Sequence, residues 1–132
     1  MTRYLVDTHV WLWFAESPDR LPSEVRQALL DPGNEAWISV ASIWEIAIKT
    51  ALGRLTLSGT VDQFVAAYGP SAGFALLPIE AHHAVAVAEL PQYHGDPFDR
   101  LLICQAQLES MTLVTADAQM GKYSIATLWS LS

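Results

Sequence analysis

Short apolar runs alternate with helix-length segments along the whole chain, and this alternation limits the fold more than any other feature. The runs are typical of buried strands, and the segments between them carry helix-starting and helix-ending residues. Because strands separated by helices usually pair in parallel, the order predicts an α/β sandwich around a central, mainly parallel sheet of about five strands. The expected strands are residues 4–6, 36–39, 74–77, 111–114 and 126–129. The expected helices begin near Thr8, after a cap at Ser23, near Ala41, after a cap at Thr60, near Glu80 and at Pro97.

The length of the chain fits one such sandwich. Of its 132 residues 52% are hydrophobic, and a chain of this length buries roughly two-thirds of its unfolded surface, so we expect a single domain over residues 1–132. Its one cysteine, Cys104, lies in a periodic apolar stretch and is expected to be a buried, unreactive thiol. With no disulfide framework, secretory leader or membrane-length apolar run, the protein is expected to be cytoplasmic and to bind no membrane.

The net charge of -7, from 14 acidic and 7 basic side chains, at first argues against a nucleic-acid ligand, because phosphate affinity usually comes from Lys and Arg. The objection weakens if acidic side chains hold metal. Four metal-bound carboxylates would leave -3 on the rest of the chain, and one or two divalent ions would make the cleft neutral or positive. The charge therefore suits a metallonuclease, and it also suits a basic protein partner.

Two aspartates follow expected strands. Asp7 comes directly after the first strand, and Asp117 follows the strand that ends at Val114. Ligands of open parallel sheets bind beyond the carboxyl ends of the strands, so we expect both aspartates to be metal ligands. The Thr115 hydroxyl is expected to orient one of the site carboxylates. For Asp7 alone, an N-cap of the next helix is an equally good interpretation.

Glu45 lies in the middle of an expected helix that is apolar nearly all round. It can form an i,i+4 ion pair with Lys49 on an exposed face. A lone glutamate in so apolar a helix is expensive to bury unless it is paired or bound to metal. We therefore interpret Glu45 as a site residue, with the ion pair as the alternative.

The stretch Asp96-Pro97-Phe98-Asp99 is the most informative one. Pro97 fits the first position of a helix, which places Asp96 at the N-cap and Asp99 at the third residue. Capping explains Asp96 but not Asp99, whose carboxylate lies in the first turn, where the helix dipole favours an anion. We predict that Asp99 is a ligand and that Asp96 is the cap, with an outer contact to the site. The four histidines show no zinc spacing, and the adjacent His82 and His83 are expected to point to different helix faces.

Four stretches, in this order along the chain, together resemble the PIN-domain family and, within it, the VapC-type toxins of bacterial toxin–antitoxin pairs. Each motif alone is weak, but the ordered set extends from end to end and is specific. Cys104 stands where such sequences are expected to have alanine, a departure that should not touch the site. The stretches are residues 4–13, 39–49, 96–106 and 113–117.

The resemblance implies a PIN-like three-layer α/β/α sandwich with an acidic site that binds Mg2+ or Mn2+. It implies an endoribonuclease, the toxin component of a type II toxin–antitoxin module, with RNA as substrate, a VapB-type antitoxin as partner and a homodimeric state. Such a site would hydrolyse the phosphodiester through a metal-bound water and leave a 5′-phosphate and a 3′-hydroxyl. The site residues that it implies are Asp7, Glu45, Asp99 and Asp117. The basic residues closest to the motifs, and so the candidates for the RNA backbone, are Arg100, Lys49, Arg54 and Lys122.

Three other functions fit the residues less well than a ribonuclease does. A phosphatase of the haloacid dehalogenase type needs a second aspartate where this chain has His9, and a phospho-receiver domain needs an acceptor aspartate near Leu77, which is missing. A catalytically inactive PIN-like fold that binds RNA or protein is the remaining alternative. Four intact carboxylates argue against it, because a scaffold gains nothing from charges that repel one another.

An apolar row on the helix near Ala41 has two interpretations. Trp44, Ile48 and Leu52 follow one another at i, i+4, i+8 spacing beside the expected core face. The row belongs to a fully buried core helix, or it lines a groove for an amphipathic antitoxin segment that brings a basic residue toward the carboxylates.

Overall fold

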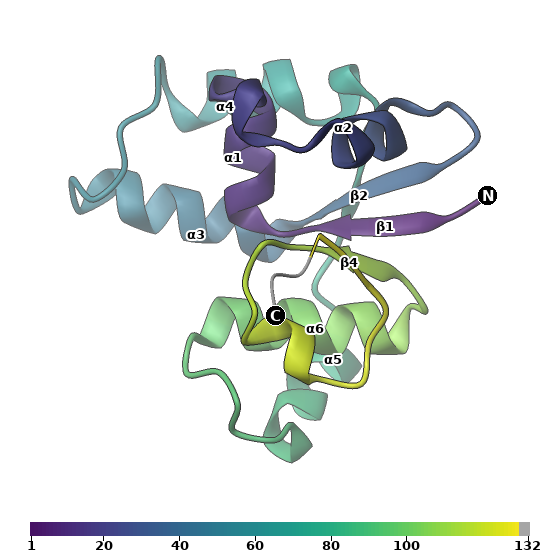
Figure 1. Cartoon of the computed structure of the whole chain (residues 1–132). Coiled ribbons are helices and arrows are strands. Elements are labelled where there is room, and N and C mark those ends of the chain that lie inside the picture. The colour runs from purple at the N-terminus through teal and green to yellow at the C-terminus, as the bar shows by residue number, and fades with distance from the viewer. Residues whose placement is uncertain (130–132) are drawn as a thin grey trace.

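The computed structural model describes residues 1–129, and within that range the strands form one parallel sheet in the order β3-β2-β1-β4-β5. Strand β1 lies in the middle, with β2 and β4 on either side (Figure 1). This arrangement confirms the predicted sheet. The strands are β1 (Arg3–Val6), β2 (Glu35–Ser39), β3 (Phe74–Leu77), β4 (Thr112–Val114) and β5 (Thr127–Leu128).

Helices cover both faces of the sheet, so the molecule has the three layers of an α/β/α sandwich (Figure 1). The α-helices are α1 (Thr8–Glu16), α2 (Ser23–Leu30), α3 (Val40–Ala51), α4 (Val61–Tyr68), α5 (Ala81–Ala86) and α6 (Pro97–Leu108). Short 3-10 turns are η1 (Pro18–Arg20), η2 (Pro70–Ala72), η3 (Val87–Glu89) and η4 (Met120–Lys122). Helices α1 to α4 pack on one face, and α5 and α6 pack on the other.

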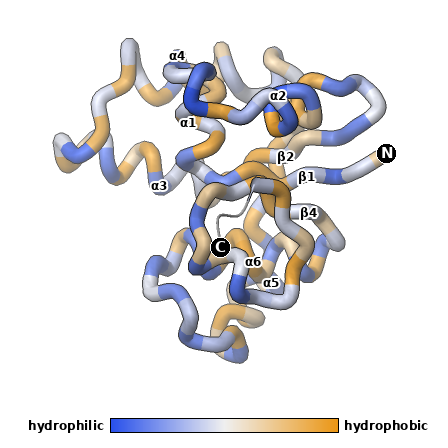
Figure 2. Tube along the Cα trace, viewed as in Figure 1, coloured by the Kyte–Doolittle hydropathy of each residue, from blue (hydrophilic) through white to orange (hydrophobic). Residues whose placement is uncertain are grey.

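Successive side chains of the central strands point to opposite faces of the sheet, so β1 and β4 each place one apolar residue in either core. Leu5 and Leu113 enter the core under α6, whereas their neighbours Val6 and Val114 enter the core under α1 to α4. All four side chains are fully buried. Strands that are buried on both faces are expected to be apolar, and in Figure 2 the central strands carry hydrophobic colour over part of their length, while β1 begins in hydrophilic colour.

Side-chain caps fix the starts of α3, α4 and α6. Thr60 accepts a hydrogen bond from the Gln63 amide while the Gln63 side chain accepts one from the Thr60 amide, which is a complete capping box. The prediction for Ser23 was wrong, because α2 begins at Ser23 itself and Pro22 takes the cap position. The Ser23 hydroxyl instead accepts a hydrogen bond from Gln27, one turn further on, at 3.3 Å.

The solvent exposure of its side chains decides between the two interpretations of the apolar row on α3. Trp44 is 58% exposed and Leu52 60% exposed, whereas Ile46 on the opposite side is 1% exposed. The core interpretation of this row was therefore wrong, and α3 buries only one of its faces. Within the described part of the chain, none of the helices has the length and apolar character needed to cross a membrane.

Candidate active site

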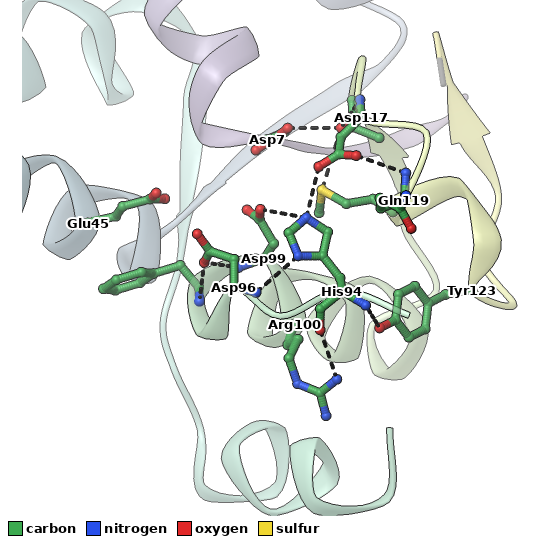
Figure 3. A network of polar contacts seen from close by, with 12 residues as sticks. Asp7, Glu45, His94, Asp96, Asp99, Arg100, Asp117, Gln119 and Tyr123 are labelled. Atoms are coloured by element: carbon green, nitrogen blue, oxygen red, sulfur yellow. Dashed lines mark hydrogen bonds and ion pairs between the residues drawn. The ribbon is translucent and has the colours of Figure 1, made fainter. Parts of the chain in front are cut away.

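Acidic side chains converge at the carboxyl edge of the sheet. Asp7 follows β1, Asp117 lies in the loop after β4, Glu45 points in from α3 and Asp99 from the first turn of α6 (Figure 3). Parallel strands end at the same edge, so the topology brings together residues that are up to 110 positions apart in the sequence. The structure thus places all four residues predicted for the site around one space.

Asp7 occupies the N-cap position of α1, but its side chain makes no capping hydrogen bond. Its carboxylate is 4% exposed and accepts a hydrogen bond from the Thr115 hydroxyl at 2.9 Å. The same hydroxyl accepts the Asp117 amide at 3.0 Å, so Thr115 ties the two strand ends together as expected. Burial raises the pKa of Asp7, and the nearby charges of Glu45 and Asp117 add to that rise.

Glu45 is both ion-paired and buried. Its Oε2 accepts a hydrogen bond from the Lys49 ammonium at 2.7 Å, and the residue is 1% exposed. The i,i+4 pair therefore exists, but it lies at the wall of the site and not on a free face. The hydrogen bond to Glu45 raises the pKa of Lys49, so this lysine remains a cation beside the carboxylates.

The first turn of α6 separates its two aspartates as predicted. Asp96 Oδ1 accepts the amides of Phe98 and Asp99 at 2.8 and 3.2 Å, which confirms Asp96 as the N-cap. Asp99 makes no capping bond and points toward the other carboxylates (Figure 3). Burial and the surrounding negative charge raise its pKa to about 8. The neighbours that contribute are Asp7, Asp96, Glu45 and Asp117.

His94 is a site residue that the sequence analysis missed. Its Nε2 lies 2.8 Å from Asp117 Oδ2 and 3.1 Å from Asp99 Oδ2, and its Nδ1 accepts the Asp96 amide at 3.0 Å. Because Nδ1 is an acceptor, we infer that the proton is on Nε2, which donates to the two carboxylates. His94 was judged by zinc spacing alone, and its place two residues before the Asp96 cap was the signal that could have found it.

Both oxygens of Asp117 are engaged by the protein. Oδ2 faces His94, and Oδ1 accepts the Gln119 amide at 2.8 Å. Although burial acts to raise it, the pKa of Asp117 is lowered by these hydrogen bonds. Asp117 is thus held as a carboxylate, while Asp99 takes up a proton near neutral pH.

The prediction that Arg100 contacts the RNA backbone was wrong. Arg100 is 7% exposed, and its guanidinium points away from the carboxylates (Figure 3). It donates hydrogen bonds to carbonyl oxygens in the segment that leads to the site, so it fixes that loop. The carbonyls belong to Val87, Leu90, Pro91 and His94. Arg54 and Lys122 are exposed, and Lys49 is half-buried.

The prediction that His82 and His83 point apart was also wrong. The Nε2 atoms of His83 and His82 lie 2.8 and 3.5 Å from the same Glu109 oxygen. Both rings thus meet at Glu109, the C-cap residue of α6. His83 Nδ1 accepts the Glu80 amide, so its Nε2 carries the proton and serves as a donor to Glu109.

The oxygens at the site fit a hard divalent cation. Among residues 1–129, Asp7 Oδ1 and Glu45 Oε1 are fully buried and accept no hydrogen bond. A buried carboxylate oxygen without a partner costs folding free energy. Mg2+ or Mn2+ would remove this cost, since such ions prefer carboxylate oxygens as ligands. Asp99 and Asp117 lie beside the same space, each with an oxygen on His94 Nε2.

Comparison with known proteins agrees with this geometry. The family model described as the PIN domain matches residues 4–126. Ribonuclease VapC22 of Mycobacterium tuberculosis is 32% identical over 126 residues, which cover 93% of each protein. The crystal structure of VapBC2 from Rickettsia felis, bound to a promoter DNA fragment, matches with a TM-score of 0.72 at 15% identity, over 96% of this chain and 98% of that one. DNA-bound VapBC from Salmonella typhimurium matches with a TM-score of 0.70 at 16% identity, over 98% and 100%.

Proposed function

The chain belongs to the PIN-domain family, in its VapC-type branch, and from this premise we propose that it is a divalent-metal-dependent endoribonuclease, the toxin of a type II toxin–antitoxin module. The observation that carries the proposal is the cluster of buried carboxylates with unpartnered oxygens at the carboxyl edge of the sheet. The similarity to Ribonuclease VapC22 supports RNA as the substrate.

Asp7, Glu45 and Asp99 are proposed to hold Mg2+ or Mn2+ directly. Asp7 and Glu45 each have one oxygen bound by the protein and one free, and Asp99 Oδ2 faces His94. Asp117, whose two oxygens face His94 and the Gln119 amide, acts mainly through His94. When bound, a divalent ion activates water as the nucleophile and stabilises the charge that develops on the phosphate.

The residues around the ligands have positioning roles. Thr115 fixes the orientation of the Asp7 carboxylate, and the N-cap bonds of Asp96 fix the turn that carries Asp99. Lys49 keeps a positive charge beside Glu45, which attracts the phosphate of an incoming RNA strand. The expected products are a 5′-phosphate and a 3′-hydroxyl.

The partner is proposed to be a VapB-type antitoxin, as in the VapBC complexes that share this fold. The row of Trp44, Ile48 and Leu52, in which Trp44 and Leu52 are exposed and Ile48 is half-buried, offers an apolar face for an amphipathic antitoxin segment. A basic residue on that segment would enter the acidic site and block it. The homodimer implied by the resemblance remains a prediction, and the molar mass of the purified protein from light scattering tests it.

Incubation of the purified protein with total cellular RNA tests the function. We expect cleavage in Mg2+ or Mn2+ and its loss on addition of EDTA, with 5′-phosphate ends on the fragments. The competing function is a catalytically inactive PIN-like module that binds RNA or protein. Intact RNA after incubation in either metal, with the RNA or the antitoxin still bound, would favour that module.

A further inference from the structure

A surface hollow lies between α1 and α3, next to the acidic site. Its volume is about 310 Å³. Thr8, on one wall, directly follows Asp7, and Lys49, on the other, is ion-paired with Glu45 at 2.7 Å. The hollow therefore shares its walls with the site. Its lining residues are Thr8, His9, Leu12, Ile46, Lys49, Arg54 and Leu55.

Positive charge is scarce in this protein, and two of its basic side chains line the hollow. The chain has 7 basic residues against 14 acidic ones. Of these, Arg100 is buried on carbonyl oxygens and Arg3 is paired with Glu35. The exposed Arg54 lines the hollow together with Lys49, which is paired with Glu45, while Arg20, Arg26 and Lys122 lie outside its lining. For a polyanion that is repelled by most of the surface, this is the favourable place beside the carboxylates.

The remaining lining suits the base and sugar of one nucleotide. Leu12, Ile46 and Leu55 provide an apolar floor. The exposed ring of His9 is part of the lining, and its centroid lies 6.3 Å from that of Trp13. A base can stack on an exposed aromatic ring. The volume lies at the low end for small-ligand pockets, so it matches a single nucleotide unit better than a folded peptide segment.

We propose that this hollow binds the ribonucleotide next to the scissile phosphate. Arg54 and Lys49 contact its phosphate, and its base lies on the apolar floor against His9. The inference rests on the proposed ribonuclease function and adds to it where the RNA strand lies relative to the metal ligands. An antitoxin segment is the less favoured occupant, because the neighbouring carboxylates favour a basic segment and the hollow itself is basic.

The test is the binding of a short fluorescent single-stranded RNA in Ca2+, followed by anisotropy over a range of salt concentrations at pH 8, with the RNA checked for integrity afterwards. For Arg54→Gln we expect severalfold weaker binding and a salt slope that is smaller by about 0.7, the loss of one phosphate contact. For His9→Ala we expect roughly fivefold weaker binding at an unchanged slope, because a stacked ring makes no phosphate contact. The matched control is Arg26→Gln, since Arg26 is exposed and lines another surface hollow, on α2, and we expect it to bind like wild type.

The outcomes of these measurements distinguish failure of the proposed RNA position from failure of the proposed ribonuclease function. Wild-type binding by both Arg54→Gln and His9→Ala overturns the inference, and so does a loss of antitoxin affinity without a loss of RNA affinity. If wild type cleaves total RNA while these variants bind normally, only the placement of the RNA fails. If the variants lose RNA binding but wild type cleaves nothing, the hollow stands and the ribonuclease fails.

Discussion

At the scale of single residues, Asp99 is held in the metal-free site at an electrostatic cost. Its pKa is about 8 in the folded protein, against an ordinary value of 3.8. Between these two values the folded state holds a proton that the unfolded state has released. The free energy of unfolding contributed by Asp99 therefore decreases as the pH rises from about 4 to about 8. A bound cation would remove this cost and displace the proton.

Asp99→Asn should accordingly flatten the pH dependence of stability. In EDTA, we expect the melting temperature of wild type to decrease between pH 5 and pH 8, and that of Asp99→Asn to decrease less, with a difference of about 5 °C or more at pH 8. Thermal unfolding by circular dichroism measures it. A variant that is less stable than wild type at pH 8 would show that Asp99 is not in a repulsive cluster.

His94 should act as a hydrogen-bond donor between two carboxylates and not as a metal ligand. Its Nδ1 already accepts the Asp96 amide, which leaves the proton on the nitrogen that faces Asp99 and Asp117. We expect His94→Ala to weaken Mn2+ binding roughly tenfold, as for residues that orient ligands, and His94→Gln, which keeps an N–H donor, to recover part of it. Calorimetric titration with Mn2+ gives both affinities. Complete loss of binding in both variants would instead make His94 a direct ligand.

The sequence predicted the acidic residues of the site better than their supports. Asp7 and Asp117 could be found because they follow apolar strands, and Asp99 because capping accounted for Asp96 alone. The role of Arg100 could not be found, because its carbonyl partners lie in the irregular segment before α6, and no periodicity predicts how such a segment turns. For His94 the signal was its place two residues before the Asp96 cap. Because Arg100 is next to an acidic motif in the sequence, it was expected to contact RNA. In the folded protein its guanidinium instead donates hydrogen bonds to backbone carbonyl oxygens.

At the scale of helices and strands, the start of α6 carries a residue that stabilises the helix, Asp96, and a residue of the acidic site, Asp99. Asp96→Ser keeps a capping oxygen, so we expect stability and RNA cleavage close to those of wild type. Asp96→Ala should lose about 1 kcal/mol of unfolding free energy. Asp99→Ser should lose cleavage without losing the cap. Denaturant unfolding and cleavage rates, measured on the same preparations, distinguish these effects. Loss of cleavage in Asp96→Ser equal to that in Asp99→Ser would make Asp96 a ligand.

Helix α3 should tolerate the loss of its exposed tryptophan. Trp44 is 58% exposed and touches Phe98 with its ring centroid at 5.2 Å. We expect Trp44→Ala to remain folded and active as a nuclease but to form a weaker complex when co-expressed with the reading frame immediately upstream. The control is Leu108→Ala, which changes an apolar residue of α6 that is 47% exposed, and whose complex should be unaffected. Unfolding of Trp44→Ala would contradict the exposed-row account.

The strands and helices were largely predictable because each carries its own signal. Apolar runs marked the strands to within one or two residues, and Thr60 and Pro97 marked helix starts through their backbone chemistry. The helical stretch near Glu80 proved to be α5 followed by the 3-10 turn η3. The exposure of α3 was not predictable from its composition. An all-round apolar helix can be covered or open, and only the packing of the other layers decides which.

At the scale of the whole molecule, the order of the strands determines where the acidic residues of the site gather. The parallel order β3-β2-β1-β4-β5 brings the ends of β1 and β4 side by side, so that acidic residues from both ends of the chain meet. The net charge of -7 would repel RNA if the site were empty of metal. The protein should therefore need the divalent ion both to cleave RNA and to bind it.

The rate of cleavage of a labelled RNA as a function of Mn2+ concentration tests this requirement most directly. Wild type should show a rate that rises with Mn2+ and saturates, and so should the control Asp62→Asn, which removes an exposed carboxylate on α4. Asp7→Asn and Asp99→Asn should show no cleavage at any Mn2+ concentration while remaining folded. A wild-type rate in EDTA, or a wild-type Mn2+ curve for Asp99→Asn, would contradict the account.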